Sequence, residues 1–433
     1  MKRERVLSLS EKIEILGGVP LRGRAPISGA KNSVLPILAA TVMTGGRSEI
    51  LNCPELSDVR ASMRILRCLG CEAEYRDCAV TVRSDGLCGA QIPAELMREM
   101  RSSIIFLGAI LARFGEARLC APGGCDIGLR PIDLHLAAFR EMGVHIDECG
   151  GVIRCKCPNG IRGADISLSF PSVGATENVM LAACAAKGRT RIFNAAREPE
   201  IVDLAAFLNR AGARVRGAGS AEIVIDGGAR LSGCRHRVIP DRIAAGSFLA
   251  AGAITGGSVT AVGARAEHLR TVLPVFRAAG CEVSETSDGL RLDAPERLRA
   301  VNYIRTMPYP GFPTDLQAVV TACMCVADGV SIVRETIFEN RYKHVPDLVR
   351  LGADIRLEDG VAVIRGARKL TGAQVTAADL RGGFALLLAG LAAEGKTTVF
   401  GVEHIDRGYE NVCENLRRLG ARIRRSRENG DGI

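Results

Sequence analysis

Apolar residues follow two different periods along this chain, and segments with the two periods alternate. Apolar positions three and four apart, the spacing of a helix with one buried face, run through residues 59–69 and 269–279. Strict alternation of apolar and polar residues, typical of strands, runs through residues 353–357 and 361–365. The sequence therefore predicts an α/β fold of short strands and helices.

Two series of glycines divide the chain into units of about seventy residues. Those of the first series end a helical segment, as in LGCEAEY and LGADIRL; they are Gly70, Gly143, Gly212, Gly280, Gly352 and Gly420. Those of the second series lead into a short strand, as in RFGEARL and AKGRTRI; they are Gly46, Gly115, Gly188, Gly257, Gly329 and Gly395. Because glycine commonly ends a helix, each unit is expected to contain a strand, a helix, two strands and a second helix.

Six units of this kind predict two similar domains of three units each. We expect the first domain at residues 30–239 and the second at residues 1–29 plus 240–433, with an active-site cleft between them. The boundary falls near residues 238–241, after the third unit. Strands predicted at residues 14–16 and 25–28 precede the first unit and would complete the sixth, so the chain would cross between the domains twice.

The helices that end at the second-series glycines consist mostly of small and apolar residues, so we expect them inside their domains. They are predicted at residues 33–44, 104–114, 177–187, 244–255, 316–328 and 384–394. The position about fifteen residues before each glycine is polar, and the six residues there are Lys31, Arg101, Ser172, Arg242, Asp315 and Arg381.

These polar positions lie at helix N-termini, which attract anions. Lys and Arg oppose the helix dipole there, so the basic residues of the set indicate a bound phosphate or carboxylate. Ser172, Asp241, Asp315 and Asp379 are of residue types that cap helices, and capping alone is the alternative for each of them.

The charge of the chain is spread rather than gathered in blocks. The 433 residues contain 57 Lys and Arg against 48 Asp and Glu, a net charge of +9, and there is no Trp. Nucleic-acid binders usually concentrate basic charge beside aromatic stacking platforms. The composition therefore favours a small anionic substrate over a nucleic acid.

No segment predicts export or membrane insertion. The longest apolar runs, residues 104–112 and 384–393, are about half as long as a bilayer crossing requires. Residues 1–16 are interrupted by acidic side chains, so they form no signal-peptide core. The sixteen Cys follow neither a disulfide nor a zinc spacing. We expect a cytoplasmic protein with reduced thiols and no metal.

Eight motifs occur in order on the six-unit repeat: SGAKN (28–32), PGGCDIGLRPIDLH (122–135), PSVGATEN (171–178), NAAREPEI (194–201), FPTDLQ (312–317), FENR (338–341), DLR (379–381) and HIDRGYE (404–410). Together they resemble the UDP-N-acetylglucosamine 1-carboxyvinyltransferases (MurA), a family of enolpyruvyl transferases, from about residue 13 to residue 424. The resemblance implies two inside-out α/β barrel domains that close over a cleft.

The resemblance also implies a reaction. The family transfers the enolpyruvyl group of phosphoenolpyruvate to the 3-hydroxyl of UDP-N-acetylglucosamine and releases phosphate through a tetrahedral intermediate, at the start of peptidoglycan precursor synthesis. By resemblance, Cys125 is the general acid, forms a covalent adduct with phosphoenolpyruvate and is alkylated by fosfomycin. The glycine-rich loop around Cys125, followed by Arg130, favours a reactive thiol over a buried apolar one.

The remaining roles follow from the same resemblance. Asp315 is the base or binder at the sugar hydroxyl, Asp379 relays protons or orients a neighbour, and Lys31 and Arg407 complete the catalytic set. The residues expected to bind phosphoenolpyruvate are Lys31, Asn32, Arg130, Arg381 and Arg407. Those expected to bind UDP-N-acetylglucosamine are Arg101, Arg130, Pro131, Ile132, Asp133, Leu134, Pro171, Ser172, Val173, Gly174, Asp315 and Ile337. No cofactor, metal, membrane or obligate protein partner is expected.

Two alternatives stay open. The sister enzyme 3-phosphoshikimate 1-carboxyvinyltransferase has the same fold and chemistry, but it lacks the reactive Cys loop and the PSVGATEN and NAAREPEI motifs. A non-catalytic UDP-sugar sensor would be expected to have lost at least one of four residues, and all four are present: Lys31, Cys125, Asp315 and Arg407.

Overall fold

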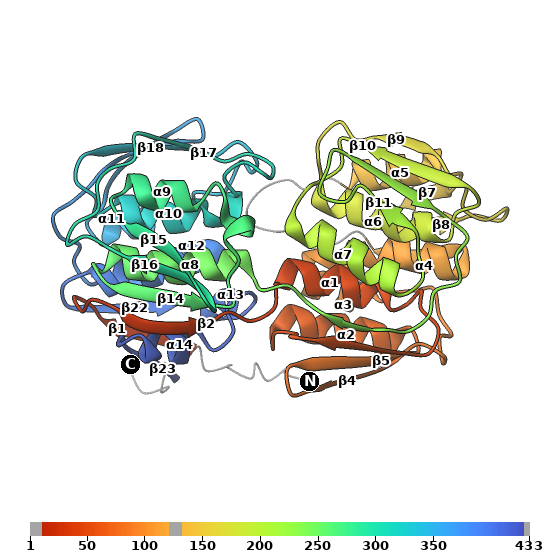
Figure 1. Ribbon diagram of the computed structural model, residues 1–433, viewed down its shortest axis with the longest axis horizontal. Helices are drawn as coiled ribbons and strands as arrows, with labels where there is room; N and C mark the ends of the chain where they lie inside the picture. The colour runs from red at the N-terminus through yellow and green to blue at the C-terminus, as the bar shows by residue number, and fades with distance from the viewer. Residues whose placement is uncertain (1–10, 121–131, 428–433) are drawn as a thin grey trace, which may run out of the picture.

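The computed structural model describes residues 11–120 and 132–427, although not the side chain of Arg101. The chain forms two lobes that lie side by side (Figure 1). One hydrophobic core gathers buried residues between Val34 and Val238. The other gathers residues from Ile13 to Ile27 and from Ile243 to Ile423. We call these the first and the second lobe.

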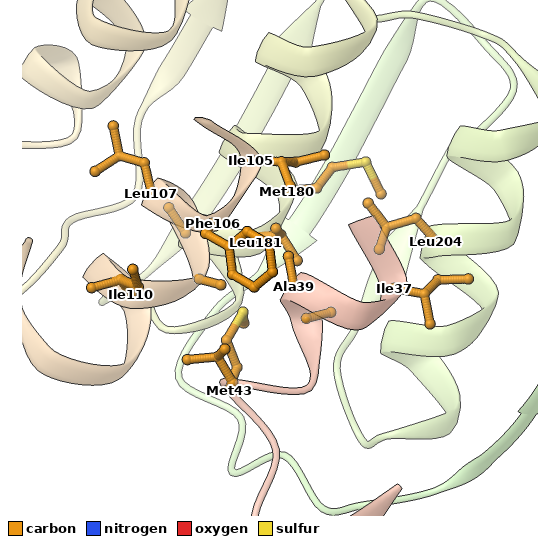
Figure 2. Packing of buried hydrophobic residues seen from close by; sticks show 14 of the residues in the cluster. Ile37, Ala39, Met43, Ile105, Phe106, Leu107, Ile110, Met180, Leu181 and Leu204 are labelled. Carbon is orange, nitrogen blue, oxygen red and sulfur yellow. The ribbon is translucent and has the colours of Figure 1, made fainter. Parts of the chain in front are cut away.

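Six inner helices, three in each lobe, are buried along almost their whole length. In the first lobe they are α1 (Lys31–Ala40), α4 (Phe106–Phe114) and α6 (Val173–Cys184), and in the second α8 (Arg242–Ile254), α10 (Gln317–Met324) and α12 (Leu380–Ala392). The inner helices of one lobe pack on one another. Figure 2 shows side chains of α1, α4 and α6 meeting around Phe106. These small and apolar helices therefore form the interior, as predicted.

Six outer helices each keep one exposed face. They are α2 (Ser57–Cys68), α5 (Asp133–Glu141), α7 (Pro199–Arg210), α9 (Leu273–Ala278), α11 (Val345–Arg350) and α14 (Val412–Arg418). Each ends two residues before a first-series glycine, and all six of these glycines have positive φ. Glycine adopts that conformation without steric cost, so the first series is confirmed as a set of helix C-caps.

Six sheets cover the helices. In the first lobe the strand orders are β13 (Arg235–Arg237), β3 (Arg47–Leu51), β5 (Ala79–Arg83), β4 (Glu72–Arg76); β6 (Glu116–Cys120), β8 (Val152–Lys156), β7 (His145–Cys149); and β11 (Val215–Arg216), β12 (Glu222–Asp226), β10 (Arg189–Phe193), β9 (Asp165–Ser167). In the second they are β15 (Glu282–Thr286), β16 (Gly289–Asp293), β14 (Ser258–Val262), β2 (Arg22–Pro26); β17 (Tyr303–Arg305), β18 (Val330–Arg334), β20 (Val361–Arg365), β19 (Asp354–Glu358); and β21 (Gln374–Thr376), β22 (Lys396–Phe400), β1 (Glu11–Leu16), β23 (Arg422–Arg427).

The shorter helices complete the fold. They are α3 (Ala94–Glu99), α13 (Val402–Ile405) and three 3-10 helices, η1 (Arg101–Ile105), η2 (Ala266–Leu269) and η3 (Thr314–Leu316). In the described part of the chain, no helix combines the length and apolar character that a membrane crossing demands.

The N-terminal strands differ in part from the prediction. Strand β1 pairs with β22 and β23 and so completes the sixth unit, as expected. Strand β2, however, runs parallel to β14 and belongs to the sheet of the fourth unit. In the same way β13, which follows the third unit, runs parallel to β3 and joins the sheet of the first unit. Figure 1 shows the red strands β1 and β2 in the lobe that is otherwise green to blue.

Helix boundaries also differ from the prediction. Four inner helices, α1, α6, α8 and α12, begin two to four residues earlier than expected. The other two, α4 and α10, begin one or two residues later, because the 3-10 helices η1 and η3 precede them. The predicted helix at residues 269–279 is broken into η2, a turn and α9. Pro274 lies in the first turn of α9, where its missing backbone N–H leaves no helical hydrogen bond unmade, so it favours a new helix start at this point.

Candidate active site

The two segments that connect the lobes are hydrogen-bonded to each other. The backbone N–H of Ala30 donates to the carbonyl of Ile239 at 2.7 Å, and that of Asp241 donates to Ser28 at 2.9 Å. The connection places the N-termini of α1 and α8 side by side. Asp241 caps α8 through one carboxylate oxygen, and its other oxygen accepts the backbone N–H of Lys31 at 3.3 Å. One carboxylate therefore ties a helix start of each lobe to the crossing.

Lys31 and Arg407 share one counter-ion, Asp58. The ammonium of Lys31 lies 2.5 Å from Asp58 Oδ2, and Nε of Arg407 lies 3.1 Å from Oδ1. Lys31 begins α1, Asp58 lies in the first turn of α2, and Arg407 follows α13 in the other lobe. This ion-paired group joins the two lobes. Its Lys31 and Asp58 side chains are buried, whereas Arg407 of the second lobe is 33% exposed.

Burial and the opposite charge of the partner shift the pKa values of Lys31 and Asp58 in opposite directions. Burial lowers the pKa of Lys31, and Arg407 and Arg381 lower it further, while Asp58 raises it. Burial alone would raise the pKa of Asp58, but Lys31 and Arg407 outweigh it and hold that pKa below its usual value. Asp58 therefore stays ionised beside two cations.

Asp315 is held by ion pairs rather than by a helix cap. It lies within η3, and it is the N-cap neither of η3 nor of α10, whose N-caps are Pro313 and Leu316. Its two oxygens accept from Arg341 at 2.6 Å and from Arg381 at 3.2 Å, and Asn32 of the other lobe lies 3.5 Å away. Capping, the alternative for this residue, is thus wrong. The Asp315 carboxylate thus lies between two guanidinium groups.

Asp379 does cap its helix, yet only with one oxygen. Oδ1 accepts the backbone N–H groups of Arg381 and Gly382, both at 2.9 Å, at the start of α12. Oδ2 is buried and hydrogen-bonds to no described residue. Both ring nitrogens of His344 are likewise buried without such a partner, and burial lowers the pKa of His344 to about 4. The capping role of Asp379 therefore leaves one oxygen available for another role.

Arg381 is positioned by an aromatic ring. Its guanidinium lies 5.3 Å from the ring centroid of Tyr409, whose hydroxyl is 2.8 Å from Ser247. Nε and Nη1 of Arg381 are buried and donate to no described residue. A guanidinium with two buried nitrogens that donate to no described residue is suited to an anionic ligand.

Arg242, the other basic residue at a helix start, is engaged differently. It forms a buried ion pair with Glu200 of the first lobe at 2.9 Å and lies 5.4 Å from the Tyr309 ring. Its place at a helix start predicts that it faces a bound anion. Its partner is a carboxylate of the protein, which links the lobes.

The predicted nucleotide-sugar residues lie mostly on other elements of the first lobe. Ser172 caps α6 by accepting the N–H of Ala175 at 3.3 Å, so the capping alternative holds for it. A Cβ at Gly174 would come within 3.1 Å of the His135 ring, which explains the glycine. The other half-buried positions are Pro171 and Val173 beside Ser172, Ile132 and Leu134 at α5, and Ile337 after β18, while Asp133 is exposed.

The predicted residues thus fall into three groups. Contacts bring together Lys31, Asn32, Asp315, Asp379, Arg381 and Arg407. Those contacts do not extend to residues 132–134 and 171–174. Cys125, Arg130 and Pro131 lie outside the described residues, and Arg101 is described only as the first residue of η1.

Sequence reasoning missed Asp58 and Arg341 as members of the site. Arg341 stood inside the FENR motif without an assigned role, and its ion pair with Asp315 became visible only in three dimensions. Asp58 has the appearance of an ordinary first-turn acid of an amphipathic helix. Nothing in its local sequence indicates two cations beside it.

The fold and a family model define the class of protein. A model described as EPSP synthase (3-phosphoshikimate 1-carboxyvinyltransferase) matches residues 15–423. The enolpyruvyl transferase NikO from Streptomyces tendae is 26% identical, with a TM-score of 0.87 over 97% of this chain and 100% of that one. EPSP synthase from Acinetobacter baumannii, 19% identical with a TM-score of 0.75 over 96% of this chain and 100% of that one, shares the fold. The class is that of the enolpyruvyl transferases.

Closer relatives narrow the class. UDP-N-acetylglucosamine 1-carboxyvinyltransferase 2 of Caldanaerobacter subterraneus subsp. tengcongensis is 51% identical over 412 residues, 95% of this chain and 99% of the relative. UDP-N-acetylglucosamine 1-carboxyvinyltransferase 1 of Symbiobacterium thermophilum is 49% identical over 425 residues, 97% and 96% of the two chains. The chain belongs to the UDP-N-acetylglucosamine 1-carboxyvinyltransferase family.

Proposed function

We propose that the protein transfers the enolpyruvyl group of phosphoenolpyruvate to the 3-hydroxyl of UDP-N-acetylglucosamine and releases phosphate. The observation that carries the proposal is a pair of adjoining contacts across the two lobes. Lys31 and Arg407 meet at Asp58, and Asn32 and Arg381 meet at Asp315. Cations of two geometries suit the phosphate and the carboxylate of phosphoenolpyruvate, and a carboxylate suits the proton of a hydroxyl.

Each chemical step has a residue in this scheme. In the addition, the Cys125 thiol gives a proton to the methylene carbon while the sugar oxygen bonds to the adjacent carbon and loses its proton to Asp315. In the elimination, the new methyl group returns a proton to the Cys125 thiolate and the bond between carbon and the phosphate oxygen breaks, which restores the double bond and releases phosphate. Lys31, Arg381 and Arg407 offset the negative charge of phosphoenolpyruvate and the departing phosphate, with Asn32 and Arg130 beside them.

The nucleotide sugar is proposed to lie against the first lobe. Its contacts are assigned to Arg101, residues 130–134 and residues 171–174 of the first lobe, and to Ile337 of the second lobe. The two hydrophobic cores support a division into domains at residues 30–239 and 1–29 plus 240–433. We place the reaction in the cytoplasm, where the family's substrates would be consumed for peptidoglycan precursors and the thiol of Cys125 would stay reduced.

Phosphate release tests the proposal. Phosphoenolpyruvate is supplied with UDP-N-acetylglucosamine or with shikimate 3-phosphate, using the wild type and Cys125→Ala. Release only with the sugar nucleotide, lost in the variant, is the expected result. Release with shikimate 3-phosphate would assign the protein to the sister activity, and UDP-sugar binding without any release would indicate a sensor.

A further inference from the structure

Glu335, which follows β18, uses its two carboxylate oxygens toward two different segments. Oε1 accepts from the backbone N–H groups of Ile337 at 2.7 Å and Phe338 at 3.1 Å, and from the Thr306 hydroxyl at 2.9 Å. Oε2 accepts from the Thr314 hydroxyl at 2.8 Å. The residue is 7% exposed, so this carboxylate depends on protein hydrogen bonds rather than on water.

The two segments carry different parts of the candidate site. Thr314 immediately precedes Asp315, and Ile337 is assigned to the nucleotide sugar. Arg341 binds the same short segment from its own side, since its Nη2 donates to the Thr314 carbonyl at 3.2 Å and to Asp315 at 2.6 Å. The Glu335 carboxylate thus holds this segment through the Thr314 hydroxyl, and the Arg341 guanidinium holds it through the Asp315 carboxylate.

Ordering the loop after β18 needs only one of these oxygens. Oε1 by itself satisfies the N–H groups of Ile337 and Phe338, which an amide side chain would do equally well. The bond from Oε2 to Thr314 adds nothing to that loop. It does fix the distance between the loop and the residue before Asp315.

We propose that Glu335 is a positioning residue that sets the spacing between Asp315 and the nucleotide contact at Ile337. This inference rests on the proposed function, because Asp315 and Ile337 take their roles from it. The sugar hydroxyl reaches the Asp315 carboxylate only when the nucleotide is seated at the matching distance. Loss of the Thr314 bond therefore misplaces the base relative to a substrate that still binds.

Thr314→Val is the sharpest variant, because valine keeps the shape of threonine and removes only the hydroxyl. We expect kcat to fall about tenfold and KM for UDP-N-acetylglucosamine to rise, while KM for phosphoenolpyruvate changes less than about twofold. Thr314→Ser should restore most of the activity, since it returns the hydroxyl. Glu335→Gln should be intermediate, because its oxygen can still order residues 337–338.

Ser258→Ala is the matched control. It removes another hydroxyl-to-carboxylate bond of the second lobe, from Ser258 to Asp293 at 2.6 Å, in the sheet of β14. Its kinetic constants should equal those of the wild type, and thermal unfolding of the two variants shows whether their losses of stability match. A Thr314→Val enzyme with the kinetics of this control would overturn the assignment. So would equal rises in both KM values, or a Thr314→Ser enzyme as slow as Thr314→Val.

A double-mutant cycle tests the coupling directly. If Glu335 joins the two segments, Thr314→Val and Ile337→Ala will reduce kcat/KM by less in combination than the product of their separate effects. Effects that simply multiply would show two independent sites and refute the inference. Wild-type turnover is measured first: its absence would refute the proposed function, whereas normal turnover with unaffected variants refutes only the role of Glu335.

Discussion

Asp58 has the least obvious role among the charged residues of the site. It is the shared counter-ion of Lys31 and Arg407, so an anionic substrate must bind beside a negative charge that already engages both cations. The carboxylate keeps Lys31 protonated, because it opposes the lowering of that pKa by burial. In the proposed function, Asp58 would therefore hold both cations in place and keep Lys31 charged for phosphoenolpyruvate.

Asp58→Asn should reduce kcat/KM for phosphoenolpyruvate about tenfold or more, because removal of one partner leaves buried charge uncompensated. The pKa of Lys31 should fall further in the variant, so activity should be lost at a lower pH on the alkaline side than in the wild type. The pH dependence of kcat/KM measures both effects. Asp347→Asn, which changes a first-turn aspartate of α11 in another unit, is the control. An alkaline limb that stays in place would contradict this role for Asp58.

His344 makes stability depend on pH. Burial is the main cause of its low pKa of about 4, with Arg341 acting in the same direction and Asp379 opposing it. Below pH about 6.5 the unfolded chain takes up a proton that the folded protein cannot accept until the pH approaches 4. Stability is therefore complete above pH about 6.5 and declines as the pH falls toward 4, by about 3 kcal/mol from this residue.

Chemical denaturation at pH 7.5 and at pH 5 should show this decline in the wild type and a smaller one in His344→Gln. Burial also lowers the pKa of His268 to about 4, so some pH dependence will persist in the variant. His145→Gln, at an exposed position of β7, should leave the wild-type decline unchanged. An equal decline in His344→Gln and the wild type would disprove the contribution of His344.

Asp379, at the start of helix α12, caps the helix with Oδ1 and has a second, buried oxygen, Oδ2, that could serve catalysis. Asparagine caps helices about as well as aspartate, whereas alanine does not. Asp379→Asn should therefore keep the thermal stability of the wild type within about 0.5 kcal/mol, while Asp379→Ala should lose about 1 kcal/mol. If the buried Oδ2 serves catalysis, both variants should lose activity to a similar extent. Full activity in Asp379→Asn would show that Asp379 only caps the helix and has no role in catalysis.

The outer helices owe their ends to glycine conformation, which can be tested where space is not limiting. Gly420 follows α14 with φ +98°, and a Cβ there would meet no atom within 4 Å. Gly420→Ala should cost about 1 kcal/mol through backbone strain alone. Gly89 also has open space, but its φ lies outside the positive range, so Gly89→Ala is the control. Equal stability of the two variants in urea unfolding would contradict the C-cap role.

The two lobes are linked by hydrogen-bonded crossings and by ion pairs, an arrangement suited to hinge closure. Binding of UDP-N-acetylglucosamine should bring the lobes together. Small-angle scattering with and without the sugar nucleotide should show a smaller radius of gyration in the complex. Identical profiles at saturating ligand would count against closure.

Local sequence was sufficient for the repeat, the buried inner helices and the helix ends. Residues three and four apart share a helix face, and glycine alone adopts positive φ without cost, so both features are written in neighbouring residues. Gly257 shows the limit of that reasoning. It continues the second series, but positive φ falls on Gly256, and Gly257 is required because a Cβ there would lie 1.9 Å from the Leu21 carbonyl oxygen.

Contacts between distant segments were decided only by the tertiary structure. The motifs indicated Lys31, Asp315 and Arg407 by resemblance, yet not that Asp58 would pair with two of the three, because a buried charge is defined by what surrounds it. The partner of β2 and the task of Glu335 have the same origin. Periodicity is a property of adjacent residues, whereas these hydrogen bonds, ion pairs and strand pairings join positions that the sequence separates by tens to hundreds of residues.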